Sequence, residues 1–235
     1  MARDGHERAI IIGILALQGA FLEHQTALQR LSLNKTIDTI LVRTAEDLDR
    51  CDALIIPGGE STTIALLARL SGVLEPLKLF VKTKPVWGTC AGAILLSQAV
   101  EGAKKGGQEL LGAMSITIAR NGWGSQIESF EASLQVPGLR DPAVPFTGIF
   151  IRAPVILSLT PTPSDHPIVV VAHLSRDLLP SALSSPNHSA EPRTYVAVRQ
   201  GLHFLTTFHP ELTNDDRFHD YFVRECVLSL FVGVS

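Results

Sequence analysis

The sequence predicts an α/β fold built around a mostly parallel β-sheet. Over roughly the first hundred residues, stretches with strand character alternate with stretches of helical periodicity, and the apolar runs are continuous, as in strands covered on both faces. The chain has 235 residues, of which 46% are apolar, so it can bury a large core. The sequence shows no clear linker or internal repeat, so we expect one domain over residues 1–235, with a flexible tail at residues 1–8.

The amino-terminal half is expected to form four strands and their connecting helices. Residues 10–17 form a buried strand, and residues 21–31 follow with the apolar spacing of a helix. Further strands are expected at residues 38–44, 52–57 and 84–88. The remaining helical stretches of this half are residues 45–51, 62–81 (one or two helices) and 91–100.

The carboxyl-terminal half is richer in β structure. Extended stretches are expected at residues 112–124, 129–136, 146–157, 167–174 and 194–208, the last two as hairpin material. Between these last two, residues 175–194 are rich in Ser and Pro, so we expect a surface loop excursion there. A helix at residues 215–232 closes the chain.

Composition excludes several classes of function. The net charge of −3 marks neither a nucleic-acid nor an anionic-membrane binder, and no apolar stretch reaches the roughly 20 residues that span a bilayer. The apolar segment at residues 9–17 follows mixed acidic and basic residues and precedes no A-x-A site, so we expect a strand rather than a signal peptide. Cys51, Cys90 and Cys226 lie far apart without zinc spacing, which argues against a disulfide framework or metal knuckle and favours a reducing compartment, the cytoplasm.

Residues 88–92, Gly-Thr-Cys-Ala-Gly, join a strand to a helix in the G-x-nucleophile-x-G pattern of a nucleophile elbow. Side chains at Gly88 and Gly92 would clash in so tight a turn. The turn aims the sulfur of Cys90 at the amino end of the next helix, whose free N–H groups favour a thiolate. The N–H of Ala91 can donate to an oxyanion. The alternative is a buried packing cysteine, which we expect for the other two cysteines.

A thiolate needs a base, and His209 is the candidate among eight histidines. His209 ends a strand in the string F-H-P-E-L, and Glu211, two residues on, projects to the same face of an extended segment. A carboxylate beside an imidazole fixes its tautomer and stabilises the imidazolium, so Cys90, His209 and Glu211 can form a nucleophile, a base and an orienting acid. Taken alone, the string fits a solvated strand end equally well. The other histidines, including His24 and His219, fit ordinary core or partly exposed positions.

The string P-G-G-E-S-T follows the third expected strand, and its loop lies at the same edge of a parallel sheet as the Cys90 turn. Gly58 and Gly59 let backbone N–H groups approach a ligand, and one of these groups could be the second oxyanion donor. The alternative, compatible with the first, is a glycine turn in which Ser61 or Thr62 caps the next helix.

With these three motifs in order, the chain resembles the class I, or triad, glutamine amidotransferases, and more narrowly the glutaminases of pyridoxal 5′-phosphate synthases. The matching strings are GILALQGAFLEH, LIIPGGESTT, WGTCAGAILL, IARNGWGSQIESFEASL, FTGIFIRAP and FHPELTNDDRFHDYFV, which cover most of residues 10–223. The resemblance implies a flavodoxin-like three-layer sandwich, with helices on both faces of the sheet and added β-hairpin strands in the carboxyl-terminal half.

The resemblance also implies an activity, the hydrolysis of L-glutamine to L-glutamate and ammonia, with no cofactor and no metal. Cys90 would attack the side-chain amide, His209 would transfer the proton with Glu211 orienting it, and water would hydrolyse the thioester. The residues implied for glutamine binding are Gly58, Gly59, Glu60, Ser61, Arg120, Ile151 and Arg152, and those for the oxyanion are Gly59 and Ala91. The two arginines suit this role, because a guanidinium group can form two parallel hydrogen bonds with the α-carboxylate of glutamine. The alternative for either arginine is an ordinary surface salt bridge.

The implied partner is the barrel subunit of a pyridoxal 5′-phosphate synthase, which would receive the ammonia within a hetero-oligomer. Docking would reorient a peptide in the loop of Gly59 and complete the oxyanion hole, with Gln18 at or near the interface. The chain departs from the family pattern at residues 175–194 and in its tail, which are longer, and at Gly122 and Trp123, where Ser and Phe are expected.

Three rival functions share some or all of these motifs. A glutaminase for another synthase, such as that of the histidine pathway, is disfavoured by the strings LQGAF–EH and FIRAP. A non-catalytic regulatory subunit of the same fold is disfavoured by the intact cysteine, histidine and glutamate. A PfpI-like peptidase also places a cysteine on an elbow, but the H-P-E string and the P-G-G-E-S-T loop are unlike that group.

Overall fold

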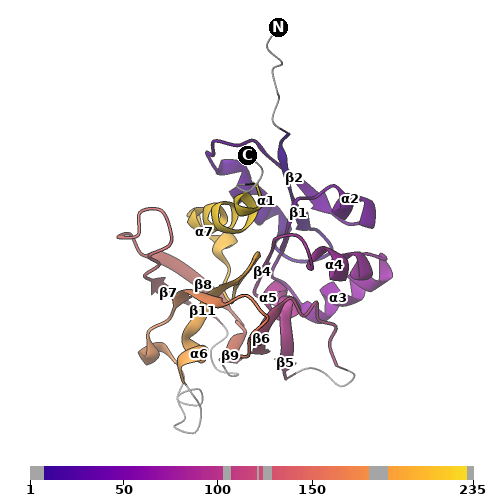
Figure 1. Cartoon of the computed structure of the whole chain (residues 1–235). Coiled ribbons are helices and arrows are strands. Elements are labelled where there is room, and N and C mark those ends of the chain that lie inside the picture. Colours follow the sequence, from indigo (N-terminus) through magenta and orange to yellow (C-terminus); the bar gives the residue numbers. More distant parts are fainter. Residues whose placement is uncertain (1–7, 103–106, 121, 124–128, 180–189, 232–235) are drawn as a thin grey trace.

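The computed structural model describes residues 8–102, 107–120, 122–123, 129–179 and 190–231, and a seven-stranded β-sheet lies at its centre (Figure 1). The strands of this sheet are β1 (Ile10–Leu15), β2 (Ile37–Val42), β3 (Ala53–Ile56), β4 (Val86–Thr89), β10 (Ile168–His173), β11 (Tyr195–Gln200) and β12 (His203–Thr206). Their spatial order is β10-β11-β12-β4-β3-β1-β2. The neighbours from β2 to β12 pair in parallel, and β11 and β10 complete the sheet as antiparallel strands. The prediction of a mostly parallel sheet is confirmed.

Helices cover both faces of this sheet, as expected for a three-layer sandwich (Figure 1). They are α1 (Phe21–Arg30), α2 (Ala45–Asp49), α3 (Ser61–Leu70), α4 (Leu74–Phe80), α5 (Ala91–Leu96) and α7 (Arg217–Phe222). Leu28 of α1 and Phe218 of α7 share one core with Ile12 of β1. Ile64 of α3 shares a second core with Leu54 of β3. Successive strand side chains point to opposite faces, so continuous apolar strands fill both cores.

Two smaller sheets lie beside the main one (Figure 1). The first has the order β5-β6-β9 and consists of β5 (Ser97–Glu101), β6 (Met114–Ala119) and β9 (Val155–Leu159). The second is the antiparallel pair β7 (Ser129–Leu134) and β8 (Phe146–Ile151). These strands and the β11–β12 hairpin confirm the β-rich second half.

The predicted helix at residues 91–100 was wrong in its second half. The helix ends at Leu96 because Ser97 is extended, with φ of −67° and ψ of 155°. The Ser97 hydroxyl donates to the carbonyl of Ile94 at 2.7 Å, so a side chain satisfies an acceptor at the end of the helix. The chain then continues as β5, which pairs with β6.

The other differences concern breaks in elements expected to be continuous. The extended stretch at residues 146–157 is two strands in different sheets, because Arg152 turns the chain with φ of 43°. The closing helix passes from α7 into a π-helical turn (Val223–Val227) and a 3-10 turn (Leu228–Leu230). No helix within the described ranges is both long and apolar enough to cross a lipid bilayer.

The expected excursion at residues 175–194 contains ordered structure at both ends. A 3-10 turn (Arg176–Leu178) follows β10, and α6 (Ala190–Thr194) precedes β11, while residues 180–189 lie outside the described residues. The expected tail also lies outside them, except for Arg8, which forms an ion pair with Asp52.

The topology brings the candidate site residues to one edge of the sheet. Gln18 follows β1, Gly59 follows β3, Cys90 follows β4 and His209 follows β12. These four strands are parallel, so their carboxyl ends meet where α/β sheets bind ligands.

Candidate active site

Cys90 lies on a sharp turn between β4 and α5, as the elbow pattern predicts. Its backbone is strained, with φ of 47° and ψ of −101°. Hydrogen bonds hold the turn on both sides, from Cys90 N to Thr206 O at 2.8 Å and from Ile94 N to Cys90 O at 3.2 Å. A Cβ atom at Gly88 would overlap the backbone of Gly92, so the close approach of the chain requires glycine there.

His209 and Glu211 lie side by side after β12, but not on an extended segment as predicted. Pro210–Leu212 form a 3-10 turn, which brings Nδ1 of His209 to 2.8 Å from Oε1 of Glu211. The backbone N–H of His209 donates to the carbonyl of Ile149 in β8 at 2.8 Å. Only 8% of His209 and 4% of Glu211 are exposed, so the pair is largely shielded from water.

The pKa values of this pair are shifted in the directions that favour an ion pair. Burial alone lowers the pKa of His209, but hydrogen bonds with Cys90 and Glu211 raise it to about 10. Burial alone raises the pKa of Glu211, but the imidazoles of His24 and His209 lower it, and the net shift is downward. At neutral pH, an imidazolium therefore lies between the sulfur of Cys90 and the carboxylate of Glu211.

Cys90 and His209 open into a cavity of about 440 Å³, a size typical of small-molecule sites. The residues that line it are Gln18, Gly59, Glu60, Ser61, Cys90, Ala91, Ile94, Arg120, Ile151, Arg152 and His209. Of the residues implied for substrate binding, Gly58 alone is missing from this lining. It packs beneath the site, where a Cβ atom would lie 2.9 Å from Nδ1 of His209 and 3.4 Å from Cβ of Cys90. A side chain at Gly58 would therefore displace the imidazole.

Glu60 links the glycine loop to α3. Its Oε2 accepts a hydrogen bond from the N–H of Thr63 at 2.7 Å and so caps the helix. The expected cap from Ser61 or Thr62 was therefore wrong, and Thr62 instead donates its hydroxyl to Glu60. Burial raises the pKa of Glu60, but hydrogen bonds led by those from Thr62 and Arg120 lower it to about 2.

Arg120 is held at the cavity by two side chains. Its Nη2 lies 2.5 Å from Oε1 of Glu60, and its Nη1 donates to Oε1 of Gln108 at 2.8 Å. The salt bridge that was the alternative reading of Arg120 is thus present, but it lies in the wall of the cavity rather than on an open surface. A guanidinium fixed in this way can face an anionic group without losing much side-chain entropy.

Ile151 and Arg152 bring backbone close to the nucleophile. The carbonyl oxygen of Ile151 lies 4.0 Å from the sulfur of Cys90. Arg152 has φ of 43°, a conformation that non-glycine residues seldom adopt and that often marks functional sites.

The loop after β1 is hydrogen-bonded to the glycine loop after β3. The N–H of Glu60 donates to Oε1 of Gln18 at 2.9 Å, and the N–H of Ala20 donates to the carbonyl of Gly58 at 3.3 Å. Gly59, between these two points, has φ of 150°. The expected second oxyanion donor therefore lies in a segment whose position depends on Gln18.

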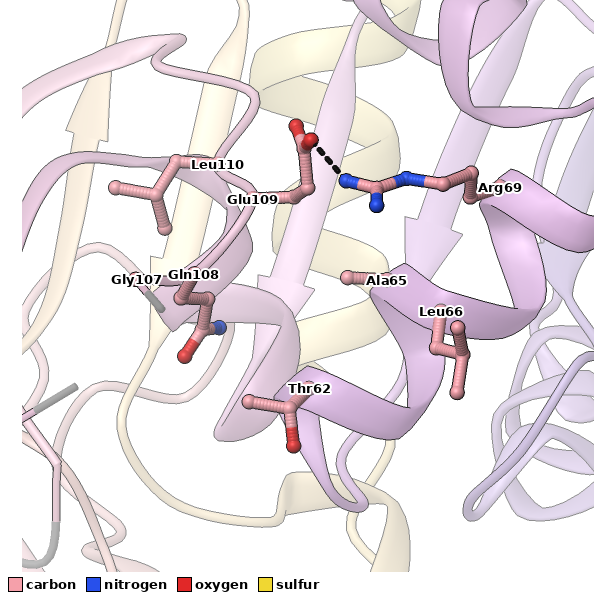
Figure 2. Close-up of a pocket in the computed structure, with 8 residues that line it drawn as sticks. All are labelled: Thr62, Ala65, Leu66, Arg69, Gly107, Gln108, Glu109 and Leu110. Carbon is pink, nitrogen blue, oxygen red and sulfur yellow. Dashed lines mark hydrogen bonds and ion pairs between the residues drawn. The ribbon is translucent and has the colours of Figure 1, made fainter. Parts of the chain in front are cut away.

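A second hollow of about 440 Å³ lies beside this cavity, between α3 and the segment before β6 (Figure 2). Figure 2 shows Arg69 and Glu109 pointing toward one another across it, joined by an ion pair. Glu109 also pairs with Lys78 at 3.4 Å. This hollow contains none of the predicted site residues, and the charges of Arg69 and Glu109 in it are paired with one another.

Sequence reasoning did not place one buried histidine beside Glu211. His24 is fully buried on α1, and its Nε2 lies 3.5 Å from Oε2 of Glu211. The available signal was its place in the apolar stripe of that helix, since a histidine at core spacing needs a polar partner. Among the described residues, no group of three or more His, Cys, Asp or Glu side chains is placed to hold a metal ion.

Known proteins resemble this chain over most of its length. Residues 14–228 match the model of the SNO glutamine amidotransferase family. A protein of Arabidopsis thaliana named "Probable pyridoxal 5'-phosphate synthase subunit PDX2" is 43% identical over 224 residues, which covers 91% of this chain and 84% of that protein. "Pyridoxal 5'-phosphate synthase subunit PdxT" of Herpetosiphon aurantiacus is 43% identical over 213 residues, which covers 90% of this chain and 98% of that protein.

Solved structures give the same picture. One described as a glutamine amidotransferase is 40% identical, with a TM-score of 0.72 over 91% of this chain and 97% of its own. A chain of the PurLQS structure from Thermotoga maritima has a TM-score of 0.51 over 96% of this chain and 100% of its own, but only 15% identity. That second likeness is one of fold alone.

Proposed function

This chain belongs to the SNO glutamine amidotransferase family, and from that premise we propose that it is the glutaminase subunit of a pyridoxal 5′-phosphate synthase. The reaction is the hydrolysis of L-glutamine to L-glutamate and ammonia. The observation that carries the proposal is the buried imidazole of His209, which bonds Glu211 and lines the same small-ligand cavity as Cys90.

In the first half of the reaction, the sulfur of Cys90 attacks the side-chain amide carbon of glutamine. A C–S bond forms and the carbonyl electrons move to oxygen, where the N–H groups of Ala91 and Gly59 stabilise the charge. The imidazolium of His209 then gives its proton to the amide nitrogen. The C–N bond breaks, ammonia leaves, and a thioester remains on Cys90.

In the second half, water replaces the sulfur. The neutral imidazole of His209 takes a proton from a water molecule, and the resulting hydroxide adds to the thioester carbon. The C–S bond breaks, L-glutamate leaves, and Cys90 and His209 return to their starting state. Glu211 stays ionised throughout and holds the ring in one orientation. The sum is one glutamine and one water consumed, and one glutamate and one ammonia formed.

The remaining residues of the cavity hold the amino-acid end of glutamine in this proposal. Arg120 faces the α-carboxylate, and its bonds to Glu60 and Gln108 fix it before substrate arrives. Ser61 and Arg152 provide further polar groups in the cavity wall, and the carbonyl of Ile151 provides an acceptor near the sulfur.

We further propose that the partner is the barrel-shaped synthase subunit, which takes up the ammonia. The PDX2 and PdxT relatives are named as subunits of pyridoxal 5′-phosphate synthase, which supports a hetero-oligomer. The bond from the N–H of Glu60 to Gln18 ties the loop of Gly59 to the first loop of the chain. Contact of the partner with that first loop reorients the peptide at Gly59 and completes the oxyanion hole. A cytoplasmic location of this single domain is part of the proposal, and the free cysteines support it.

An ammonia-release assay on the wild type and on Cys90→Ala, each with and without the synthase subunit, tests this function. We expect little release from the isolated wild type, a strong increase with the partner, and none from Cys90→Ala under either condition, although that variant still docks. Equal rates with and without partner would contradict the coupling. Unchanged turnover in Cys90→Ala would refute the mechanism, and activation by a different synthase would refute the pathway.

A further inference from the structure

Two buried histidines contact one another, and one of them lies beside the carboxylate of Glu211. His24 comes from α1 and His219 from α7, and neither is exposed to solvent. Nδ1 of His24 lies 2.9 Å from Nε2 of His219. Nε2 of His24 lies 3.1 Å from Oγ1 of Thr89 and 3.5 Å from Oε2 of Glu211. The His24 ring therefore contacts both the residue before the nucleophile and the carboxylate that orients the base.

Both rings are neutral at physiological pH. Burial lowers the pKa of His24 to about 3, against the raising effect of the Glu211 charge, and His219 and His209 lower it further. Burial also lowers the pKa of His219 to about 3, with a smaller contribution from Arg30. Each ring therefore carries one proton, and the contacts decide which nitrogen holds it.

The contacts favour a proton on Nε2 of His24. Oε1 of Glu211 accepts a hydrogen bond from His209. Oε2 of Glu211 is buried and has no hydrogen-bond partner among the described residues. Nε2 of His24 lies 3.5 Å from this oxygen. A lone pair on that nitrogen would face the carboxylate and repel it. A proton on that nitrogen would face both Oγ1 of Thr89, at 3.1 Å, and Oε2 of Glu211, at 3.5 Å.

This choice fixes the protonation of His219. With Nε2 of His24 protonated, its Nδ1 is an acceptor and receives the Nε2–H of His219. Nδ1 of His219 is then a lone pair, and it has no partner within the described part of the chain. In the opposite arrangement, the unpartnered group is a buried N–H and Oε2 of Glu211 has no donor. An unpaired N–H is rarer in protein interiors than an under-satisfied acceptor.

We propose that His24 is a positioning residue that donates from Nε2 to the Glu211 carboxylate, and that His219 sets the tautomer of His24. The triad is thereby extended into a chain from Cys90 through His209, Glu211 and His24 to His219. Trp87 confines both rings, since its ring packs against His24 and His219 at centroid distances of 5.4 and 4.9 Å. The inference rests on the proposed function, because Glu211 needs fixing only where His209 serves as the base.

The tautomer of His24 can be determined by NMR in the wild-type protein. Histidine labelled with ¹⁵N, observed by NMR through its ring nitrogen–carbon-proton correlations at about pH 7, distinguishes Nε2–H from Nδ1–H and from the doubly protonated ring. Comparison with His24→Gln assigns the signals of residue 24. We expect a neutral His24 protonated at Nε2, and a His24 protonated at Nδ1 or at both nitrogens would overturn the proposal.

The consequence for the nucleophile is tested by alkylation. Iodoacetamide is reacted with the full-length chain from about pH 5 to about pH 9, and modification of Cys90 is followed by peptide mass spectrometry. His24→Leu removes the donor, His24→Gln keeps a donor in the position of Nε2, and Leu28→Ala is a packing control on the same helix, since Leu28 is 3% exposed in the core. Without the donor, the imidazolium that faces Cys90 is held less firmly.

At about pH 7 we expect Cys90 in His24→Leu to be alkylated about tenfold more slowly than in the wild type, with His24→Gln restoring most of the rate. In the complex with the synthase subunit, kcat should fall by a similar factor while the KM for glutamine stays unchanged. Equal rates in His24→Leu and the wild type, or an equal loss in Leu28→Ala, would overturn the inference. A wild-type Cys90 that does not react would instead contradict the proposed function.

Discussion

Gly92 of the nucleophile turn lies so close to Ile56 that a Cβ atom on Gly92 would overlap the Ile56 carbonyl oxygen. Ile56 ends β3, the strand that leads into the glycine loop, while the turn follows β4. The two neighbouring strands therefore carry the sulfur of Cys90 and the expected oxyanion donor at Gly59 into one cavity, and a backbone contact between them sets their separation.

Replacing Gly92 by Ala should move this turn. We expect Gly92→Ala to lower the free energy of unfolding by about 2–3 kcal/mol, because the new methyl group meets backbone that cannot yield easily. Alkylation of Cys90 should slow as well. Gly72→Ala is the control, since Gly72 has φ of 75° but no heavy atom of the described chain within 4 Å of its added Cβ. It should cost about 1 kcal/mol in urea unfolding and leave Cys90 unaffected. Similar effects of both variants on Cys90 would contradict the contact.

Glu211→Gln keeps the size of the side chain and removes its charge. Ammonia release in the complex should fall about a thousandfold, with little change in the KM for glutamine, because the imidazolium loses its buried counter-charge. A loss of less than about threefold would contradict the role assigned to Glu211.

Glu211→Gln should also change how the free energy of unfolding depends on pH. The pKa of His209 is raised from 6.5 to about 10, so its stabilising contribution is fully present below about pH 6.5 and is lost as the pH rises to about 10. The pKa of Glu211 is lowered from 4.5, so its contribution is present above about pH 4.5 and lost below. The loss of unfolding free energy in Glu211→Gln should therefore be largest at about pH 5–6 and shrink toward about pH 10. A loss that grew with pH would contradict the ion pair.

Arg120→Lys replaces the guanidinium fork by a single ammonium. We expect the KM for glutamine to rise about tenfold with a smaller change in kcat, because in the proposed function Arg120 positions the substrate away from the reacting bond. Arg69→Lys is the matched control, as Arg69 lies in the neighbouring hollow and pairs there with Glu109 (Figure 2). If Arg69→Lys raised KM as much as Arg120→Lys, the assignment of the glutamine site would be wrong.

Protonation of His203 should account for part of the stability that the protein loses at low pH. Burial lowers the pKa of His203 from 6.5 to about 4, against the raising effect of a hydrogen bond that the ring donates to the backbone of Val81. The unfolded chain therefore binds a proton more readily, and stability is lost as the pH falls from about 6.5 to about 4. His203→Gln should recover about 2 kcal/mol of this loss at about pH 5, measured by urea unfolding relative to about pH 7.5. His173→Gln, at an exposed histidine of β10, is the control, and an equal recovery there would exclude His203 as the source.

Local patterns in the sequence were enough to predict the elbow and its partners. G-x-C-x-G predicts the Cys90 turn because only glycine permits the close approach of Gly88 to Gly92. Both glycines lie within five consecutive residues, so the sequence shows this requirement directly. The neighbourhood of His209 and Glu211 was also predictable from their spacing. Their 3-10 geometry was not, because a spacing of two residues cannot distinguish a turn from an extended segment.

Features set by distant parts of the chain escaped prediction. The end of α5 at Leu96 depends on the pairing of β5 with β6, so apolar periodicity alone extended the helix too far. The surroundings of His24 depend on α7, which places His219 beside it from a position 195 residues away. A single sequence shows that His24 lies on an apolar stripe, but it does not show what covers that stripe.

The most direct test of the catalytic account is covalent labelling with a diazoketone analogue of L-glutamine, applied to the complex of this chain with the synthase subunit and read by peptide mass spectrometry. We expect one label per chain, on the sulfur of Cys90, with labelling slowed strongly in His209→Asn and prevented by excess glutamine. A label on Cys51 or Cys226, or ammonia release that continues while Cys90 stays unmodified, would contradict the assignment of Cys90 as the nucleophile.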